Sequence, residues 1–185
     1  MPKILIPMAQ GCEELEIVTI IDLLRRAQFD VVTASLESVR VEVVASRGVR
    51  LIADTCLDEA LTQAYDAVVL AGGLPGADHL NNDDRIIDLV RNMAADGKWV
   101  AAVCAAPRVL AKAGVLEGRR ATSYPGTLDV MDIPGMSYAS ESVVIDGNIV
   151  TSRGPGTTME FALTLIELIK GRATREQVEG PLLRS

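Results

Sequence analysis

The sequence predicts an α/β fold in which helices cover both faces of a mostly parallel sheet. Three short apolar runs support this prediction, because each has the length of a buried strand and precedes a helical pattern: Lys3–Pro7, Asp66–Ala71 and Lys98–Val103. Strands that are apolar on both faces are typical of parallel sheets. With 185 residues, of which 49% are hydrophobic, the chain is expected to form a single domain over residues 1–185.

In the N-terminal half, the spacing of apolar residues defines most elements. They recur at helical spacing across Glu14–Ala27, so a helix is expected there. An alternating pattern predicts a small hairpin made of Arg40–Val44 and Val49–Ala53. Thr55 is expected to start a short helix. The other elements of this half are a strand over Phe29–Ser35 and that short helix over Leu57–Gln63.

In the C-terminal half, stop and turn signals are clearer. Asp83–Ala95 has an amphipathic pattern that ends at Gly97, which predicts a helix. Asp146-Gly147 is a strong two-residue hairpin signal between two apolar runs. A long helix is expected to be capped by Thr157 and stopped by Gly171. The ranges are Ser142–Ile145 and Ile149–Ser152 for the hairpin, and Thr157–Lys170 and Thr174–Val178 for the last two helices.

Composition excludes several functional classes. A net charge of −7 argues against general nucleic-acid binding, which needs a basic surface. Three widely spaced cysteines without a C-x-x-C pair, and a single histidine, form neither a disulfide framework nor a metal site. No run is long enough to span a membrane, and the N-terminus lacks the features of a signal peptide. A cytoplasmic protein without cofactor or metal is expected.

Cys104 occupies the most informative position in the chain. It ends the strand over Lys98–Val103, and Ala105–Leu110 is typical of a helix start, with Pro107 in the first turn. At such a turn the side chain projects from the carboxyl end of the sheet. The free N–H groups of the helix favour a thiolate, so a reactive thiol of low pKa is expected. The alternative is an inert buried cysteine.

Three loops follow the carboxyl ends of expected strands, where ligands bind in such sheets. Met8–Glu13, Gly72–Gly76 and Cys104–Pro107 are therefore expected to meet in one crevice. Gly72-Gly73 would allow close backbone approach and present N–H groups to an anion, although a plain turn is the alternative. The sequence has neither a dinucleotide-binding nor a P-loop motif.

Glu16 is the candidate acid–base group. It lies between Leu15 and Ile17 on a helix expected to pack near the crevice, so its carboxyl group would contact Cys104 and control its oxidation; the alternative is a helix-stabilising charge. His79 is expected to lie in a polar loop, after Gly76-Ala77-Asp78, and not to be the base. Cys12 precedes Glu16 by four residues and is either a resolving thiol or a passive small residue.

Four motifs together resemble the ThiJ/PfpI superfamily, and specifically its DJ-1 branch. They are Val103-Cys104-Ala105-Ala106-Pro107, Leu70-Ala71-Gly72-Gly73, Gly11-Cys12-Glu13-Glu14-Leu15-Glu16 and Thr151-Ser152-Arg153-Gly154-Pro155-Gly156-Thr157. The resemblance extends from Lys3 to Leu183. It implies a flavodoxin-like three-layer sandwich, a homodimer, and Cys104 at a nucleophile elbow with Glu16 as its acid partner.

The resemblance also implies roles for other residues. Gly73 and Ala105 would supply anion-stabilising N–H groups, with Gly72, Tyr124 and Arg153 in support. The charges at the dimer interface would be Glu13, Asp22, Arg26 and Arg47.

Activities of the family include hydration of methylglyoxal or glyoxal and repair of early glycation adducts on protein or nucleotide. Tyr124 stands where the best-known DJ-1 proteins carry histidine, and Ala105 where the protease-like PfpI branch does. Peptidase activity is therefore not expected, and the missing imidazole counts against fast glyoxalase turnover. The alternative function is a redox sensor and oxidation-regulated chaperone that acts through Cys104 and needs no turnover.

Overall fold

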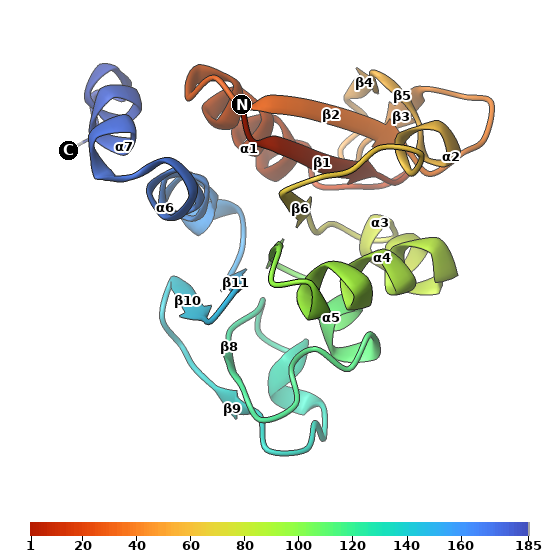
Figure 1. The fold of residues 1–185 in the computed structure, drawn as a ribbon. Coiled ribbons are helices and arrows are strands. Elements are labelled where there is room, and N and C mark those ends of the chain that lie inside the picture. Colours follow the sequence, from red (N-terminus) through yellow and green to blue (C-terminus); the bar gives the residue numbers. More distant parts are fainter. Residues whose placement is uncertain (185) are drawn as a thin grey trace.

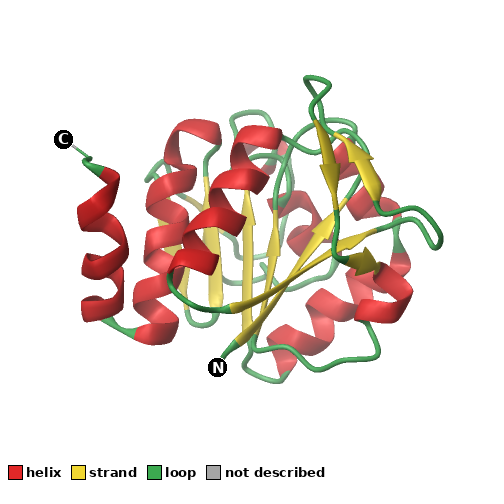
Figure 2. Cartoon of the chain, turned by 90° about the horizontal axis from the view of Figure 1, so that it is seen from above, coloured by secondary structure: helices red, strands yellow, loops and turns green. Residues whose placement is uncertain are grey.

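A seven-stranded sheet forms the middle layer of the computed structural model, which describes residues 1–184 (Figures 1 and 2). Its strand order is β10-β11-β7-β6-β1-β2-β5, and every neighbouring pair is parallel except the β10–β11 hairpin. The predicted α/β fold with a mostly parallel sheet is thus confirmed. The strands are β1 (Lys3–Met8), β2 (Asp30–Ser35), β5 (Thr55–Cys56), β6 (Ala67–Leu70), β7 (Trp99–Val103), β10 (Val143–Asp146) and β11 (Ile149–Ser152).

Helices cover both faces because the central strands are apolar on both sides. In β1, Ile4 and Ile6 belong to one buried cluster and Leu5 to the other. The first cluster lies under α1 (Glu14–Arg26) and α6 (Thr158–Lys170). The second lies under α4 and α5, and the remaining helices complete the two layers. Their bounds are α2 (Leu57–Ala60), α3 (Gly76–Asn82), α4 (Asp84–Ala95), α5 (Pro107–Lys112) and α7 (Arg172–Glu179), with 3-10 turns at Leu128–Val130, Pro155–Thr157 and Gly180–Leu182.

Two small sheets flank the main one. The predicted hairpin is confirmed as antiparallel β3 (Glu42–Val44) and β4 (Arg50–Ile52). The other small sheet, from β8 (Arg120–Ala121) and β9 (Ser137–Tyr138), is not anticipated by the sequence, because two-residue strands are too short to show a period. None of the helices within residues 1–184 is long and apolar enough to cross a membrane.

Several local predictions are wrong. His79 lies on helix α3 rather than in a loop. Thr55 belongs to strand β5, and the helix it was expected to start begins at Leu57 and ends at Ala60. Thr157 occupies the N-cap position of α6 as expected, but its side chain makes no capping hydrogen bond to that helix; its hydroxyl accepts from the Gly154 N–H at 3.0 Å. The last helix, Arg172–Glu179, is longer than expected.

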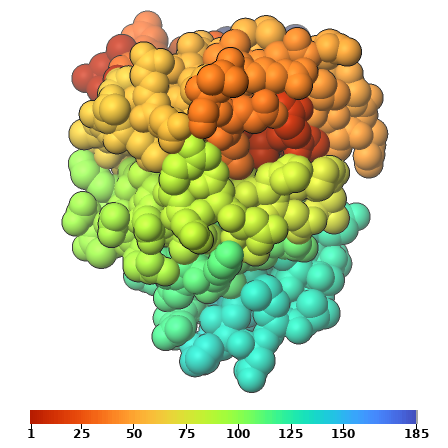
Figure 3. Space-filling view, turned by 90° about the vertical axis from the view of Figure 1, so that its right-hand side faces the viewer, coloured from red at the N-terminus to blue at the C-terminus, as the bar shows by residue number. Residues whose placement is uncertain are grey.

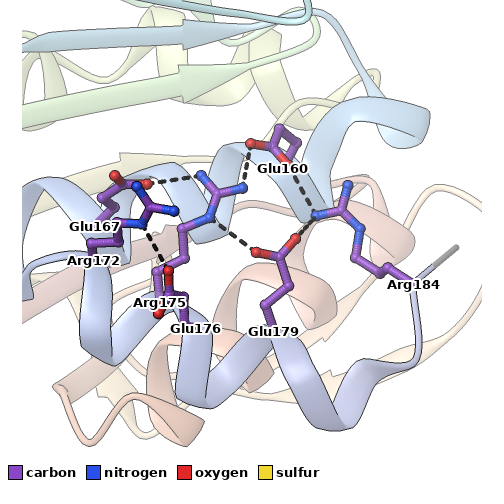
Figure 4. Close-up of polar contacts among 7 residues, drawn as sticks. All are labelled: Glu160, Glu167, Arg172, Arg175, Glu176, Glu179 and Arg184. Carbon is purple, nitrogen blue, oxygen red and sulfur yellow. Dashed lines mark hydrogen bonds and ion pairs between the residues drawn. The ribbon is translucent and has the colours of Figure 1, made fainter.

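Ion pairs between charged side chains connect α7 to α6 (Figure 4). Arg175, whose side chain is 18% exposed, donates hydrogen bonds to Glu160, Glu167 and Glu179 at 2.7–3.1 Å. Arg184 donates to Glu160 and Glu179, both at 2.9 Å. Val178 is the one buried side chain of α7. We call these five charged residues the C-terminal ion network.

Candidate active site

Cys104 lies in the turn between β7 and α5, with a backbone φ of +63°. That left-handed conformation is strained for a residue with a side chain, and it is held here by hydrogen bonds on both sides. The Cys104 N–H donates to the Ser152 carbonyl at 3.0 Å, and the Tyr124 N–H donates to the Cys104 carbonyl at 2.8 Å. The residue is 9% exposed, so only small groups reach the sulfur directly.

Glu16 projects from α1 into the same region and is fully buried. Its Oε2 accepts a hydrogen bond from the Gly72 N–H at 2.7 Å, whereas Oε1 has no hydrogen-bond partner of good geometry within residues 1–184. Burial raises the pKa of this carboxyl group to about 7, against the lowering effect of Gly72 and of the Cys104 thiol. Glu16 therefore exchanges a proton in the physiological pH range.

The Cys104 thiol is subject to opposing influences. Burial, and next the negative charge of Glu16, raise its pKa to about 12, whereas the N–H groups of Gly73 and Ala105 act in the opposite direction. The expectation of a low thiol pKa is therefore wrong, because the helix N-terminus does not outweigh desolvation and a neighbouring carboxylate. Together the two groups lose their first proton near pH 7 and keep the second well above it.

Gly72 and Gly73 allow the Cys104 turn and the segment before Glu16 to pack closely, because neither glycine has a side chain. A Cβ added to Gly72 would lie 2.6 Å from the Cβ of Cys104. Gly73 has a φ of +88°, and a Cβ there would lie 2.3 Å from the Glu13 nitrogen. The Glu13 N–H donates to the Gly72 carbonyl at 2.9 Å. The three loops expected to converge at the carboxyl edge of the sheet do so, in a packing that leaves no room for larger residues.

Tyr124 and Arg153 are linked to the Cys104 turn through the backbone, because the Tyr124 N–H donates to the Cys104 carbonyl and Arg153 follows Ser152, which accepts from the Cys104 N–H. They line a pocket of about 270 Å³ together with Ser142 and residues 154–157, and Cys104 is not among its lining residues. Tyr124 is 52% exposed. The sequence did not indicate the part played by Ser152, because it acts through its backbone carbonyl rather than its side chain.

Two other candidate groups, Cys12 and His79, differ in their surroundings. Cys12 is 1% exposed, and burial, then the charge of Glu14, raise the pKa of its thiol to about 12. Its role as a resolving thiol stays a prediction. His79 is exposed and lines a different pocket, of about 460 Å³, which Met8, Ala9 and Gln10 also line. Figure 3 shows red N-terminal residues between orange and yellow-green segments. Within residues 1–184, no group of three or more His, Cys, Asp or Glu side chains is placed to bind a metal ion.

The expected interface charges lie around α1. Asp22 and Arg26 form an exposed ion pair of 2.6 Å within the chain. Glu13 accepts a hydrogen bond from the Ser46 hydroxyl at 3.1 Å, and the Arg47 N–H donates to Glu14 at 2.8 Å. Their role in a homodimer stays a prediction.

Comparisons with known proteins agree with this geometry. The sequence profile described as the DJ-1/PfpI family matches residues 2–168. Protein DJ-1 homolog B of Arabidopsis thaliana is 43% identical over 172 residues, which are 92% of this chain and 39% of that protein. The chain spans less than half the length of each of the two Arabidopsis relatives that it matches.

Two further relatives match nearly end to end. A protein of Pyrococcus abyssi that is named a deglycase is 32% identical over 91% of this chain and 99% of its own length. The crystal structure of Drosophila melanogaster DJ-1beta has a TM-score of 0.93 and 38% identity, covering 100% of this chain and 98% of that one. The profile match, the sequence identities and the shared flavodoxin-like fold show that the chain belongs to the DJ-1/PfpI family.

Proposed function

We propose that this chain is a cofactor-free, cysteine-dependent enzyme that acts on small α-oxoaldehydes or on their early adducts with proteins and nucleotides. The observation that supports this most is the buried carboxyl group of Glu16 beside a cysteine held in a strained turn. A carboxyl group with a pKa of about 7 can both take and return a proton at neutral pH. The Pyrococcus abyssi relative named a deglycase adds support for this class of substrate.

The reaction begins with addition of sulfur to the aldehyde. The Glu16 carboxylate takes the thiol proton as the Cys104 sulfur bonds to the aldehyde carbon, and the carbonyl electron pair moves to oxygen. The N–H groups of Gly73 and Ala105, which act on the sulfur at rest, stabilise the negative charge as it moves to that oxygen. Protonation of the oxygen gives a hemithioacetal. With an early glycation adduct, the carbon–nitrogen bond breaks instead and the departing amine takes the proton.

A proton shift completes the conversion. Glu16 removes the hydrogen of the former aldehyde carbon and returns it to the neighbouring ketone carbon, which produces a thioester of the hydroxy acid. Water then cleaves the thioester and restores the thiol. One water is added overall, and no oxidant or metal is needed. Tyr124, largely exposed beside the turn, can orient a carbonyl group but is a weak base at neutral pH.

Lactate formation from methylglyoxal tests the proposal. The purified protein should produce lactate, and Cys104→Ala should abolish it because the covalent intermediate cannot form. Cys56→Ala is the matched control, since Cys56 is only partly buried and lies at the far end of the sheet. Equal rates for the protein and Cys104→Ala would exclude this function.

A second candidate is a redox sensor and chaperone that responds to oxidation of Cys104. The 9% exposure of Cys104 favours it, because peroxide is small enough to reach a largely buried sulfur. A protonated Glu16 would donate to a sulfinate oxygen and stop oxidation at that stage. Mass spectrometry after mild peroxide treatment should then find sulfinate on Cys104 before Cys56 is oxidised. Earlier oxidation of Cys56 would exclude this candidate.

A further inference from the structure

The pocket beside the Cys104 turn contains a positively charged side chain that the proposed reaction does not use. Among residues 1–184, Arg153 is the only charged side chain that lines it; the other lining residues include Tyr124, Ser142 and the turn over residues 154–157. A cationic pocket is unexpected in a chain whose net charge is −7. It is therefore a local feature of this surface rather than a consequence of overall composition.

The guanidinium of Arg153 has little hydrogen bonding within the protein. Its Nη1 donates to the Ser140 carbonyl over 3.4 Å, at the outer limit for a hydrogen bond. Its Nε–H is shielded from solvent and has no partner within residues 1–184. A guanidinium carries five N–H donors in a planar fork that fits a carboxylate. Of the two Nη groups, only Nη1 has a hydrogen bond within residues 1–184, so these groups are the donors available to an anion that enters the pocket.

Two segments that line the pocket are hydrogen-bonded to the backbone of Cys104, one to its N–H and one to its carbonyl. Ser152 accepts from the Cys104 N–H, and the next residue is Arg153. The Tyr124 N–H donates to the Cys104 carbonyl, and the Tyr124 side chain lines the pocket. The volume of about 270 Å³ suits a short chain of a few carbon atoms rather than a folded segment. The pocket is thus linked to the Cys104 turn through the backbone, and the subsite proposed below requires that a substrate on the sulfur extend its other end toward Arg153.

We propose that Arg153 forms an anion subsite, so that the favoured substrates are α-oxoaldehydes whose remaining chain ends in a carboxylate. This inference rests on the proposed function for its chemistry but adds the substrate class. A suitable substrate is γ,δ-dioxovalerate, in which two methylene groups separate the ketone from the carboxylate. Sulfur adds to its aldehyde carbon, the hydrogen of that carbon moves to the ketone carbon, and water releases α-hydroxyglutarate. The sum is again the addition of one water.

The test compares charged and neutral substrates of similar length. The ratio of kcat/KM for γ,δ-dioxovalerate to that for propylglyoxal is measured in the unmodified protein, Arg153→Met, Arg153→Lys and Arg172→Met. Arg153→Met should lower the ratio about 10- to 100-fold, because it removes a charge-assisted hydrogen bond. Arg153→Lys should retain part of the ratio, since it keeps the charge without the fork. Arg172, which is 80% exposed on α7, controls for the loss of one positive charge and should leave the ratio unchanged.

An unchanged ratio in both Arg153 variants would overturn the inference. A separate binding measurement distinguishes it from failure of the proposed function. Calorimetric titration with succinate should give heat of binding for the unmodified protein and none for Arg153→Met. If neither aldehyde is consumed but succinate binds through Arg153, the anion subsite stands and the proposed enzymatic function fails. Absence of succinate binding to the unmodified protein would count against the subsite.

Discussion

Replacing Glu16 by Gln should change how the stability of the protein depends on pH. The substitution keeps the size of the side chain and an oxygen that accepts from the Gly72 N–H, but it removes the ionisable group. In the folded protein, burial raises the pKa of this carboxyl group from 4.5 to about 7. A carboxyl group with a raised folded pKa binds its proton more tightly in the folded state than in the unfolded state. Its stabilising effect is therefore complete below pH 4.5 and is lost as the pH rises through 7.

The size of the effect follows from the two pKa values. Each pKa unit corresponds to about 1.4 kcal/mol, so a rise from 4.5 to about 7 corresponds to about 3 kcal/mol. Between pH 4.5 and pH 8, the free energy of unfolding of the unmodified protein should fall by about that amount relative to Glu16→Gln. Urea unfolding at a series of pH values, followed by the fluorescence of Trp99, the single tryptophan, measures this difference.

Glu14→Gln is the matched control for this experiment. Glu14 lies two residues away on α1, and its pKa is lowered: burial opposes the shift, but hydrogen bonds from its own N–H, Ser46 and Arg47 outweigh it. Its contribution to stability has the opposite sign and is lost as the pH falls. A difference between the unmodified protein and Glu16→Gln that stays constant from pH 4.5 to pH 8 would refute the reasoning about Glu16.

Other changes have equally definite outcomes. In Glu16→Gln the pKa of the Cys104 thiol should fall below about 12, because the substitution removes a neighbouring carboxylate while the thiol stays buried. Titration of the thiolate by its ultraviolet absorbance measures this pKa. An unchanged titration curve would show that the two groups are not coupled. Gly72→Ala should lower the free energy of unfolding by about 1–3 kcal/mol or more, because the new Cβ would lie 2.6 Å from the Cβ of Cys104. In the control Gly180→Ala the new Cβ has no atom within 4 Å, so the free energy of unfolding measured by chemical denaturation should stay unchanged. Asp83→Ala should cost about 1 kcal/mol in the same assay, because the Asp83 side chain caps α4 by accepting from the Arg85 N–H; an unchanged midpoint would contradict this.

The layered fold could be predicted because its signals are local. The runs that became β1, β6 and β7 are apolar on both faces, and a parallel sheet between two helix layers is the arrangement that buries both. The position of Cys104 after β7 and before a proline-started helix was sufficient to place it at the carboxyl edge. By contrast, β5 and β8 are two residues long and carry no periodicity that a sequence pattern can detect.

The pKa of Cys104 shows where local reasoning fails. The helix N-terminus that follows it is visible in the sequence and favours a thiolate. The burial of the thiol, and a carboxylate from a helix 88 positions earlier, depend on tertiary packing, and they have the larger effect. The sequence also could not show that the Nε–H of Arg153 is buried without a hydrogen-bond partner among residues 1–184, because this depends on tertiary packing.

The C-terminal ion network makes the local unfolding of α7 dependent on salt concentration. Because α7 buries only Val178, its docking depends on ion pairs whose attraction is screened within about 3 Å at 1 M salt. The amide protons of α7 should therefore exchange with solvent deuterium faster as ionic strength increases. Those of α6, which is held by seven buried side chains, should keep their slow exchange. The last helix would thus detach in concentrated salt while the sheet and the Cys104 turn stay folded.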